Sequence, residues 1–460
     1  MTEPHSGSAV LPRRRTAFVE GAEQLRAAAT TEPGRLRIIG AVLALLVVAF
    51  GAVTAWQTSQ RAAAADDVIE RSQPLTADAA AIYVSLADAN TAAASGFLAG
   101  GQEPPAVRER YEKDIAGAAR KLAGAAANSK GSGTASAEIA KLNALLPKYA
   151  ERIETARTYN RQGLPLGGAY LRNANDLMQT EMLPAAKELY DAEKARLGAD
   201  YDAAKSYPWA AIGLGLLALA ALVWAQRRNY RRTNRVFNLG LLTATGTAAA
   251  VLLWLVAGHT VAFAALGDSY DNGVRSLNVL NDARISTLQA RSNENLTLVA
   301  RGAVTVPDGP DEGEDQYDVD YRALMRELGD GGADRAGMGT LGAALHLADD
   351  AVGRQPVQDA MAAVEEWQER HEAAREADTQ GDYEKALDRV IGDDEATGES
   401  FDRADKALEQ AVTHEQQDFR GAAEDGRGAM TGLPVGAAVV AVLGAAGAVL
   451  GIGRRLSEYR

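Results

Sequence analysis

Four apolar stretches along the chain are each long enough to cross a lipid bilayer. A transmembrane helix needs roughly 20 predominantly apolar residues, and none of the four stretches contains Asp, Glu, Lys or Arg. The buried core helices of a soluble protein are rarely this long, and four such helices would rarely all be flanked by charged residues. We therefore predict four transmembrane helices, over residues 38–56, 206–226, 236–259 and 432–453.

The two long polar segments between these stretches carry the apolar spacing of helix bundles. In the first segment Ile82, Leu86, Ala89 and Ala93 follow one another at steps of three or four residues, which is typical of a buried helix face. Short runs of helix breakers divide the segment into four predicted helices, which favours an antiparallel four-helix bundle. These runs are Gly100–Gly101 with Pro104–Pro105, Asn128–Gly133 and Gly163–Gly168.

The two polar segments also resemble one another in sequence. Tyr149–Arg157 and Trp367–Arg375 align without a gap at a constant offset, and a glycine follows each run at Gly163 and Gly381. We interpret this match as an internal duplication. The predicted fold class is an all-α membrane protein with four transmembrane helices and two tandem extracytoplasmic four-helix bundles, at residues 57–205 and 260–431.

Basic residues set the predicted orientation. The tail 1–37, the hairpin 227–235 and the tail 454–460 together hold 14 basic and 5 acidic residues, so we expect them in the cytoplasm. The two bundles then lie outside, with net charges of −1 (18 basic, 19 acidic) and −21 (16 basic, 37 acidic). The chain is therefore predicted to be a multi-pass plasma-membrane protein with both termini inside.

The amino-acid composition excludes several kinds of functional site. The chain has no Cys and only five scattered His, so we predict no disulfide, thiol nucleophile, cofactor or metal site. The cytoplasmic segments are too short for a kinase, a cyclase or a nucleotide-binding domain, and no catalytic triad or phosphate loop can be assembled. The apolar stretches lack the buried charges of a transport path. We expect neither an enzyme nor a nucleic-acid-binding protein.

Two charged surfaces are the candidate partner contacts. The cytoplasmic hairpin presents Arg227, Arg228, Arg231, Arg232 and Arg235. Its alternative role is to set orientation and contact anionic lipid. In the second bundle, the acidic stretch 307–320 does not match a calcium-binding EF-hand loop and is predicted to be solvated and flexible. It supplies the candidate extracytoplasmic contacts Asp308, Asp311, Glu312, Glu314 and Asp315.

Other polar residues have a structural and a ligand-binding interpretation. The set Glu151, Arg152 and Arg157, with its counterpart at 369–375, matches either carboxylate recognition or ordinary ion pairing between helices. Asn90 and Asn293 lie on the first predicted helix of each bundle, where a buried Asn more often sets helix register than binds a ligand.

The helix from Ile82-Tyr-Val-Ser-Leu-Ala-Asp-Ala-Asn90 to Phe97-Leu-Ala-Gly100 is similar to the first bundle helix of bacterial receptor sensors. The layout of four spans, two outer bundles and little cytoplasmic sequence resembles the actinobacterial GlnX membrane proteins. This resemblance implies amino-acid sensing with a solute-binding lipoprotein outside and serine/threonine protein kinase G inside. It assigns no ligand-binding residue of that family to a position in this chain.

Two functions are therefore expected as alternatives. The first is a non-enzymatic transducer that senses an extracytoplasmic cue through a binding protein and reports it to a cytosolic kinase or other signalling protein. The second is a structural scaffold or assembly factor of the cell envelope. The ligand and the oligomeric state stay open.

Overall fold

The computed structural model describes residues 32–128, 133–233, 239–329, 339–392, 394–430 and 432–456. These residues form helices joined by turns, with one isolated antiparallel β-bridge between Thr305 and Asp315. The elements are α2 (Glu32–Asp67), η1 (Val68–Ser72), α3 (Gln73–Leu98), α4 (Pro105–Asn128), α5 (Gly133–Arg161), α6 (Leu166–Leu177), η2 (Met178–Met182), α7 (Leu183–Lys205), α8 (Trp209–Thr233), α9 (Leu239–Asp268), η3 (Ser269–Val274), α10 (Arg275–Ala300), α11 (Gln316–Gly329), α12 (Thr340–Leu347), α13 (Ala351–Thr379), α14 (Tyr383–Ile391), α15 (Thr397–Met430) and α16 (Leu433–Leu456).

The chain divides into two compact units, and the first, the apolar unit, contains residues 1–62, 206–261 and 429–460. Its core forms where side chains of α2, α8, α9 and α16 meet, including Leu43, Leu222, Leu241 and Ala448. Large apolar side chains also lie on its outside, where Leu253 is 71% exposed. Apolar residues on both the inside and the outside are expected of helices that pack together within lipid.

Three helical segments are long and apolar enough to cross a membrane: Gly34–Leu98, Leu166–Arg231 and Leu239–Gly267. They indicate a multi-pass membrane protein and contain the first two predicted stretches and residues 239–259 of the third. Within the described residues, the fourth predicted stretch yields a shorter apolar helix, Ala438–Leu450, inside α16. A fourth span therefore stays a prediction.

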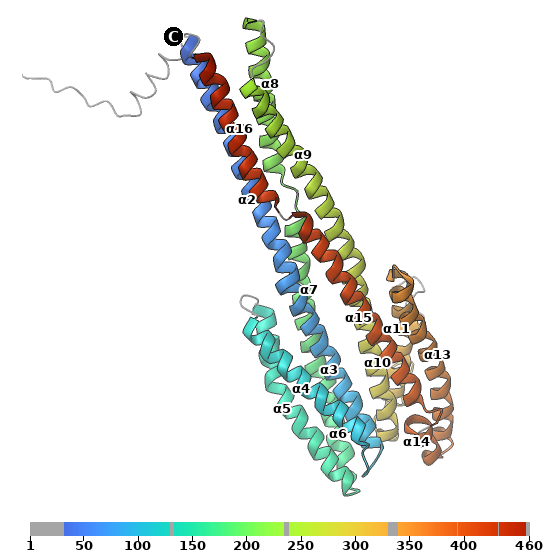
Figure 1. The fold of residues 1–460 in the computed structure, drawn as a ribbon. Coiled ribbons are helices and arrows are strands. Elements are labelled where there is room, and N and C mark those ends of the chain that lie inside the picture. The colour runs from blue at the N-terminus through green and yellow to red at the C-terminus, as the bar shows by residue number, and fades with distance from the viewer. Residues whose placement is uncertain are drawn as a thin grey trace, which may run out of the picture. The chain divides into compact units, whose positions relative to one another are not determined.

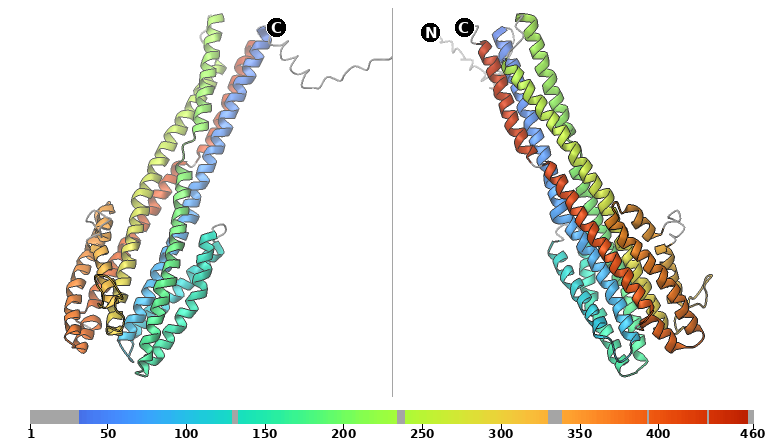
Figure 2. Two further views of the ribbon diagram at one scale, coloured as in Figure 1. Left: turned by 180° about the vertical axis from the view of Figure 1, so that it is seen from behind. Right: turned by 45° about the vertical axis from the view of Figure 1, so that its right-hand side comes forward.

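The second unit, the bundle unit, contains Ala63–Lys205 and Ala262–Gly428, here called its first and second halves. Figures 1 and 2 show α4 and α5 along one side of this unit and α11 and α13 along the other, with α3, α7, α10 and α15 between them. One continuous apolar core runs through both halves, and α3 packs directly against α10.

The prediction of two tandem four-helix bundles did not include this shared core. The sequence predicts a single buried face for the helix that begins the first half. In the structure, however, Leu86–Ala94 is buried all round, and so is most of Ala290–Leu298. Small residues in α3 and short polar residues in α10 let the two helices approach closely on a second face. The duplication itself stays a prediction.

The helix breaks that glycine and proline predicted are where helices end. α3 ends at Leu98 before Gly100, and α5 ends at Arg161 before Gly163. The matched glycines Gly163 and Gly381 both have positive φ, 67° and 82°, a conformation that favours glycine at a helix end. The sequence also suggests a loose stretch at Gly329–Gly339, which lies mostly outside the described residues.

The acidic stretch is an ordered hairpin, which corrects the prediction of a flexible loop. The backbone N–H of Val306 donates to Glu314 O at 3.0 Å, and the N–H of Gln316 donates to Val304 O at 3.1 Å. Gly309 and Gly313 turn the chain with φ of 105° and 87°. We call residues 304–316 the acidic hairpin.

Candidate functional site

A neutral polar cluster occupies the contact between α3 and α10. Asn90 Nδ2 donates to Asn175 Oδ1 and to Ser292 Oγ, both at 2.9 Å, and Asn90 Oδ1 accepts from the Tyr149 hydroxyl at 3.1 Å. Thr91 Oγ1 donates to the Leu288 carbonyl at 2.8 Å. Asn90 is buried and fully paired, so it fits the register-setting role predicted from sequence.

A charged cluster lies one turn further along α10, and its centre is Glu294. The Glu294 side chain is 1% exposed and forms an ion pair with Arg291. Its carboxylate also accepts from Trp367 Nε1 at 3.1 Å and lies 2.9 Å from His371 Nδ1. Arg291 in turn donates to Thr397 Oγ1 at 2.7 Å. Every charged group in this part of the core therefore has a partner, as buried charges require.

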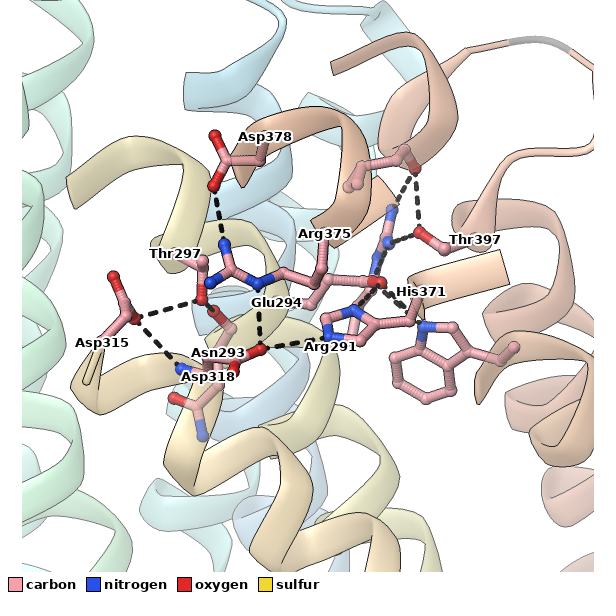
Figure 3. Close-up of polar contacts among 12 residues, drawn as sticks. Arg291, Asn293, Glu294, Thr297, Asp315, Asp318, His371, Arg375, Asp378 and Thr397 are labelled. Atoms are coloured by element: carbon pink, nitrogen blue, oxygen red, sulfur yellow. Dashed lines mark hydrogen bonds and ion pairs between the residues drawn. The ribbon is translucent and has the colours of Figure 1, made fainter. Parts of the chain in front are cut away.

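A second carboxylate, Asp318 of α11, extends the cluster toward the surface. Asp318 Oδ1 lies 3.3 Å from His371 Nε2 and 3.1 Å from Arg375 Nε, and Asp318 Oδ2 lies 3.2 Å from Arg322 Nε. Figure 3 shows the His371 ring between Glu294 and Asp318. The ring thus connects a fully buried carboxylate to a half-buried one.

These contacts shift the pKa values of the cluster in opposite directions. Burial by itself lowers the pKa of His371, but hydrogen bonds and charges from Asp318 and Glu294 outweigh burial and raise it above its usual value. Burial raises the pKa of Glu294, but Arg291 and His371 outweigh it and hold it below its usual value. The arrangement therefore favours a charged imidazolium between two carboxylates.

A cleft of about 610 Å³ opens beside this cluster, between α11 and α13. His371 and Tyr321 form part of its wall, with their rings stacked at a centroid distance of 3.8 Å. Three arginines also line it, Arg322, Arg326 and Arg375, although the second half is acidic overall. The cleft connects solvent to the titratable centre, so a bound ligand or a docked segment would contact its ionised residues.

A second charged cluster connects the two halves. Arg110 of α4 reaches Asp88 of α3 at 2.7 Å and also Asp402 and Asp405 of α15, at 3.1 and 2.9 Å. Arg284 of α10 pairs with Asp405 at 2.8 Å. A cavity of about 720 Å³ lies among these residues. The pairs of Arg110 with Asp402 and Asp405 link the first half to the second, so they fix the halves relative to one another.

Asp88 and the neighbouring Asp114 both line this cavity, and the negative charge of one disfavours ionisation of the other. Burial raises the pKa of Asp88, while the Arg110 charge opposes that rise. Burial and the nearby Asp88 carboxylate raise the pKa of Asp114 to about 8. Two carboxyl groups this close favour a state in which one of them keeps its proton.

The structure does not bring all the predicted site residues together. Arg227, Arg228 and Arg231 lie in the last turns of α8, and Arg228 stacks on Trp224 at 5.5 Å. Arg232 lies one residue before the end of the same helix, and Arg235 lies outside the described residues. In the acidic hairpin, Asp308, Glu312 and Glu314 are exposed, Asp311 is half-buried, and Asp315 turns inward to accept the Asp318 N–H at 3.1 Å.

The predicted arginine sets make ion pairs between helices. Arg157 is buried, pairs with Glu103 at 2.8 Å and stacks on Tyr111. Arg370 pairs with Glu366 and Glu399, at 2.5 and 2.9 Å. The ion-pairing interpretation therefore accounts for these residues. Arg375 is different, because it also lines the cleft beside Asp318.

The sequence analysis did not predict that Glu294, Asp318 and His371 lie together. His371 lies 77 residues from Glu294 and 53 from Asp318, so no local spacing links them. One signal was present in the repeat alignment. His371 falls in the aligned run at the position of Ile153, a buried apolar residue, and a His at such a position needs polar partners.

Comparison with known proteins identifies part of the bundle unit. Residues 64–202 match the family model of the actinobacterial sensor domain. The sensor-domain segment covers nearly all of the first half and under a third of the chain. Comparisons with curated proteins and with solved structures give no match. The sensor-domain match agrees with the predicted class of sensory membrane protein.

Proposed function

We propose that this chain is a non-enzymatic transmembrane signal transducer whose bundle unit senses a cue outside the cell. One observation carries the proposal: the sensor-domain segment begins within α2, the helix that supplies the first candidate span. Helical structure continues from Gly34 to Leu98 through α2, η1 and α3. A displacement of α3 in the bundle is thus transmitted along a continuous helix toward the membrane, as in other helical switches.

The ion pairs between the halves support joint movement of the two. Arg110 ties α4 of the first half to α15 of the second, and the neutral cluster at Asn90 ties α3 to α10. A change in the charged cluster of the second half therefore alters contacts in the sensor-domain segment. This coupling needs no enzymatic step, which agrees with the non-enzymatic role.

The cue in this proposal arrives through a separate solute-binding protein. The second half carries a net charge of −21, which attracts a basic protein face and repels a free anion. Asp308, Asp311, Glu312, Glu314 and Asp315 remain the proposed docking residues. The exposed members of this set, on the ordered hairpin, supply the docking charge, while Asp315 holds the hairpin against α11.

The output side of the proposal is the cytoplasmic arginine cluster. With both termini inside, Arg227, Arg228, Arg231, Arg232 and Arg235 form the short segment that a cytosolic kinase or other signalling protein would contact. Arg227 and Arg231 are exposed at the end of α8. A guanidinium cluster of this kind recognises carboxylates or phosphates on a partner.

The proposal is tested by crosslinking in native membranes followed by affinity purification and mass spectrometry. The wild-type chain is compared with Asp308→Asn/Asp311→Asn/Glu312→Gln. The matched control is Asp359→Asn/Glu365→Gln/Glu369→Gln, which removes three exposed charges from α13 of the same half. We expect the hairpin variant to lose an extracytoplasmic binding protein that the wild type and the control retain. Equal capture by both variants would contradict docking on the hairpin.

The output arm replaces Arg227, Arg228, Arg231 and Arg232 with Gln. We expect this variant to lose a cytosolic signalling protein while it keeps the extracytoplasmic one. Orientation is checked by single Cys labelling with an impermeant reagent, because the chain has no Cys. Asn143→Cys in α5 should react in intact cells, and Asn229→Cys in α8 only after permeabilisation. Recovery of cell-wall assembly proteins alone, unaffected by either variant, would favour a scaffold instead.

A further inference from the structure

Three potential metal ligands from distant parts of the sequence meet on the surface of the bundle unit. They are Asp350 at the start of α13 and His414 and Asp418 on α15. His414 Nε2 lies 3.2 Å from Asp350 Oδ1 and 3.0 Å from Asp418 Oδ2. One ligand atom from each of the three residues lies within 4.8 Å of the other two.

We propose that Asp350, His414 and Asp418 bind a divalent first-row transition ion, with Zn²⁺ as the reference ion. One imidazole nitrogen and two carboxylate oxygens form a donor set that such ions accept. An ion about 2.0–2.2 Å from each ligand atom needs ligand atoms roughly 3 Å or a little more apart. The separations from His414 Nε2 to Asp350 Oδ1 and to Asp418 Oδ2 meet this requirement.

The backbone around the three residues holds them in place. His414 and Asp418 are four residues apart, so both project from the same face of α15. Asp350 caps α13, and its Oδ1 accepts from the Gly353 N–H at 2.6 Å. A Cβ on Gly353 would lie 3.0 Å from His414 Cδ2, so glycine at this position gives the imidazole room beside the cap.

The site is accessible to an ion from solvent. The side chains of Asp350 and Asp418 are 46% and 51% exposed, whereas that of His414 is 20% exposed. Three protein ligands leave at least one coordination position for water, as in open zinc sites. The site is distinct from the Glu294 cluster and does not depend on the proposed signalling role.

A bound ion would connect the first turn of α13 to α15. Both helices belong to the bundle unit, and α15 continues to Met430, just before α16. Because the ion binds the folded arrangement and not the separated helices, binding would stabilise that arrangement. The inference therefore concerns a metal that reinforces one junction of the bundle.

The test is titration of the full chain in detergent by calorimetry, after chelator treatment and with a tag that contains no histidine. We expect one equivalent of Zn²⁺ to bind. His414→Gln and Asp418→Asn should each weaken binding by at least about tenfold, since loss of even an outer-shell partner has an effect of that size. Matched controls are His346→Gln, an exposed histidine of the same unit, and Asp425→Asn, two turns further along α15. Both should bind as the wild type does.

A second readout separates ligation from loss of the fold. Co²⁺ bound in place of Zn²⁺ should give visible absorption bands in the wild type and both controls, and His414→Gln should lose them while it keeps its melting temperature in chelator. No saturable Zn²⁺ binding would overturn the proposal. Wild-type affinity in His414→Gln, or an equal loss in Asp425→Asn, would also overturn it, because binding would then reflect surface charge alone.

Discussion

In the two halves of the bundle unit, aligned buried aromatic residues bind polar partners of different chemistry. In the first half, Tyr149 of α5 reaches a neutral amide, Asn90 of α3. In the second half, Trp367 occupies the aligned position and reaches a carboxylate, Glu294 of α10. Both aromatic side chains are fully buried. The same aligned position therefore supports a neutral contact that is insensitive to pH in the first half and an ionised, titratable contact in the second.

This difference has energetic consequences. Hydrogen bonds between neutral groups contribute about 1 kcal/mol each, and leaving one partner unpaired costs about 1–3 kcal/mol. Removing one member of a buried ion pair costs more, because an uncompensated charge stays in the core. The second half should therefore be the more sensitive to substitution and to pH.

The strongest test of the comparison is to separate the halves. Residues 63–205 and 262–428, expressed individually, should each lack a cooperative thermal transition, because α3 and α10 would lose the face on which they pack. Co-expression of the two segments should restore the transition. Circular dichroism and thermal melting measure both outcomes. A cooperative melt of residues 262–428 alone would show that the shared core is not required.

The next largest effect is expected from matched substitutions at the two centres. Glu294→Gln keeps the side-chain shape but leaves Arg291 without its carboxylate and His371 with Asp318 alone, so it should destabilise the bundle unit by about 3–5 kcal/mol. Asn90→Ala removes only neutral hydrogen bonds and should destabilise it by about 1–3 kcal/mol. Denaturation followed through the fluorescence of buried Trp367 reports both. Equal losses would contradict the proposed difference between the halves.

A third test uses pH. The pKa of His371 is raised above 6.5, so its stabilising contribution is complete below about pH 6.5 and is lost as pH rises through the folded-state pKa. The melting temperature of the wild type should therefore fall across this interval. His371→Ile introduces the first-half residue, Ile153, at the aligned position. This variant should be less stable at acidic pH and should lose that part of the pH dependence.

The smallest effect is expected at Asp114. Its raised pKa, about 8, means that the folded state holds the proton more tightly, so this group reduces stability as pH rises from about 4 toward 8. Asp114→Asn cannot ionise and should raise stability near pH 8, by less than the substitutions at the two buried centres change it, because solvent screens this half-buried side chain. At pH 4 the variant and the wild type should melt alike. A loss of stability at pH 8 would contradict the predicted charge state.

The sequence predicted the local elements well, because glycine, proline and apolar spacing act over a few residues. Helix ends at Leu98 and Arg161 follow directly from the breakers beside them. The packing of α3 on α10 was missed because alanine and serine carry no strong hydrophobic signal on the second face. Ser292 is buried where it accepts a hydrogen bond from Asn90, about 200 residues away in the sequence.

The charged cluster could not have been predicted for a related reason. Its members come from α10, α11 and α13, and acids and arginines are frequent throughout this chain. The potential metal ligands were missed in the same way, because Asp350 is 64 residues from His414. The hairpin could have been predicted, because Gly309 and Gly313 interrupt the acidic stretch and both have positive φ. Charge density alone led to the prediction of a flexible loop.

The order within the acidic hairpin bears on the entropy of association. A flexible acidic loop loses backbone freedom when a partner docks, at about 1–2 kcal/mol for each residue that becomes fixed. Main-chain hydrogen bonds at Val306 and Gln316 already hold this segment in one conformation. Its exposed carboxylates thus form a preorganised surface, and a partner that matches their spacing binds without that loss. Shape as well as charge would then distinguish one extracytoplasmic protein from another.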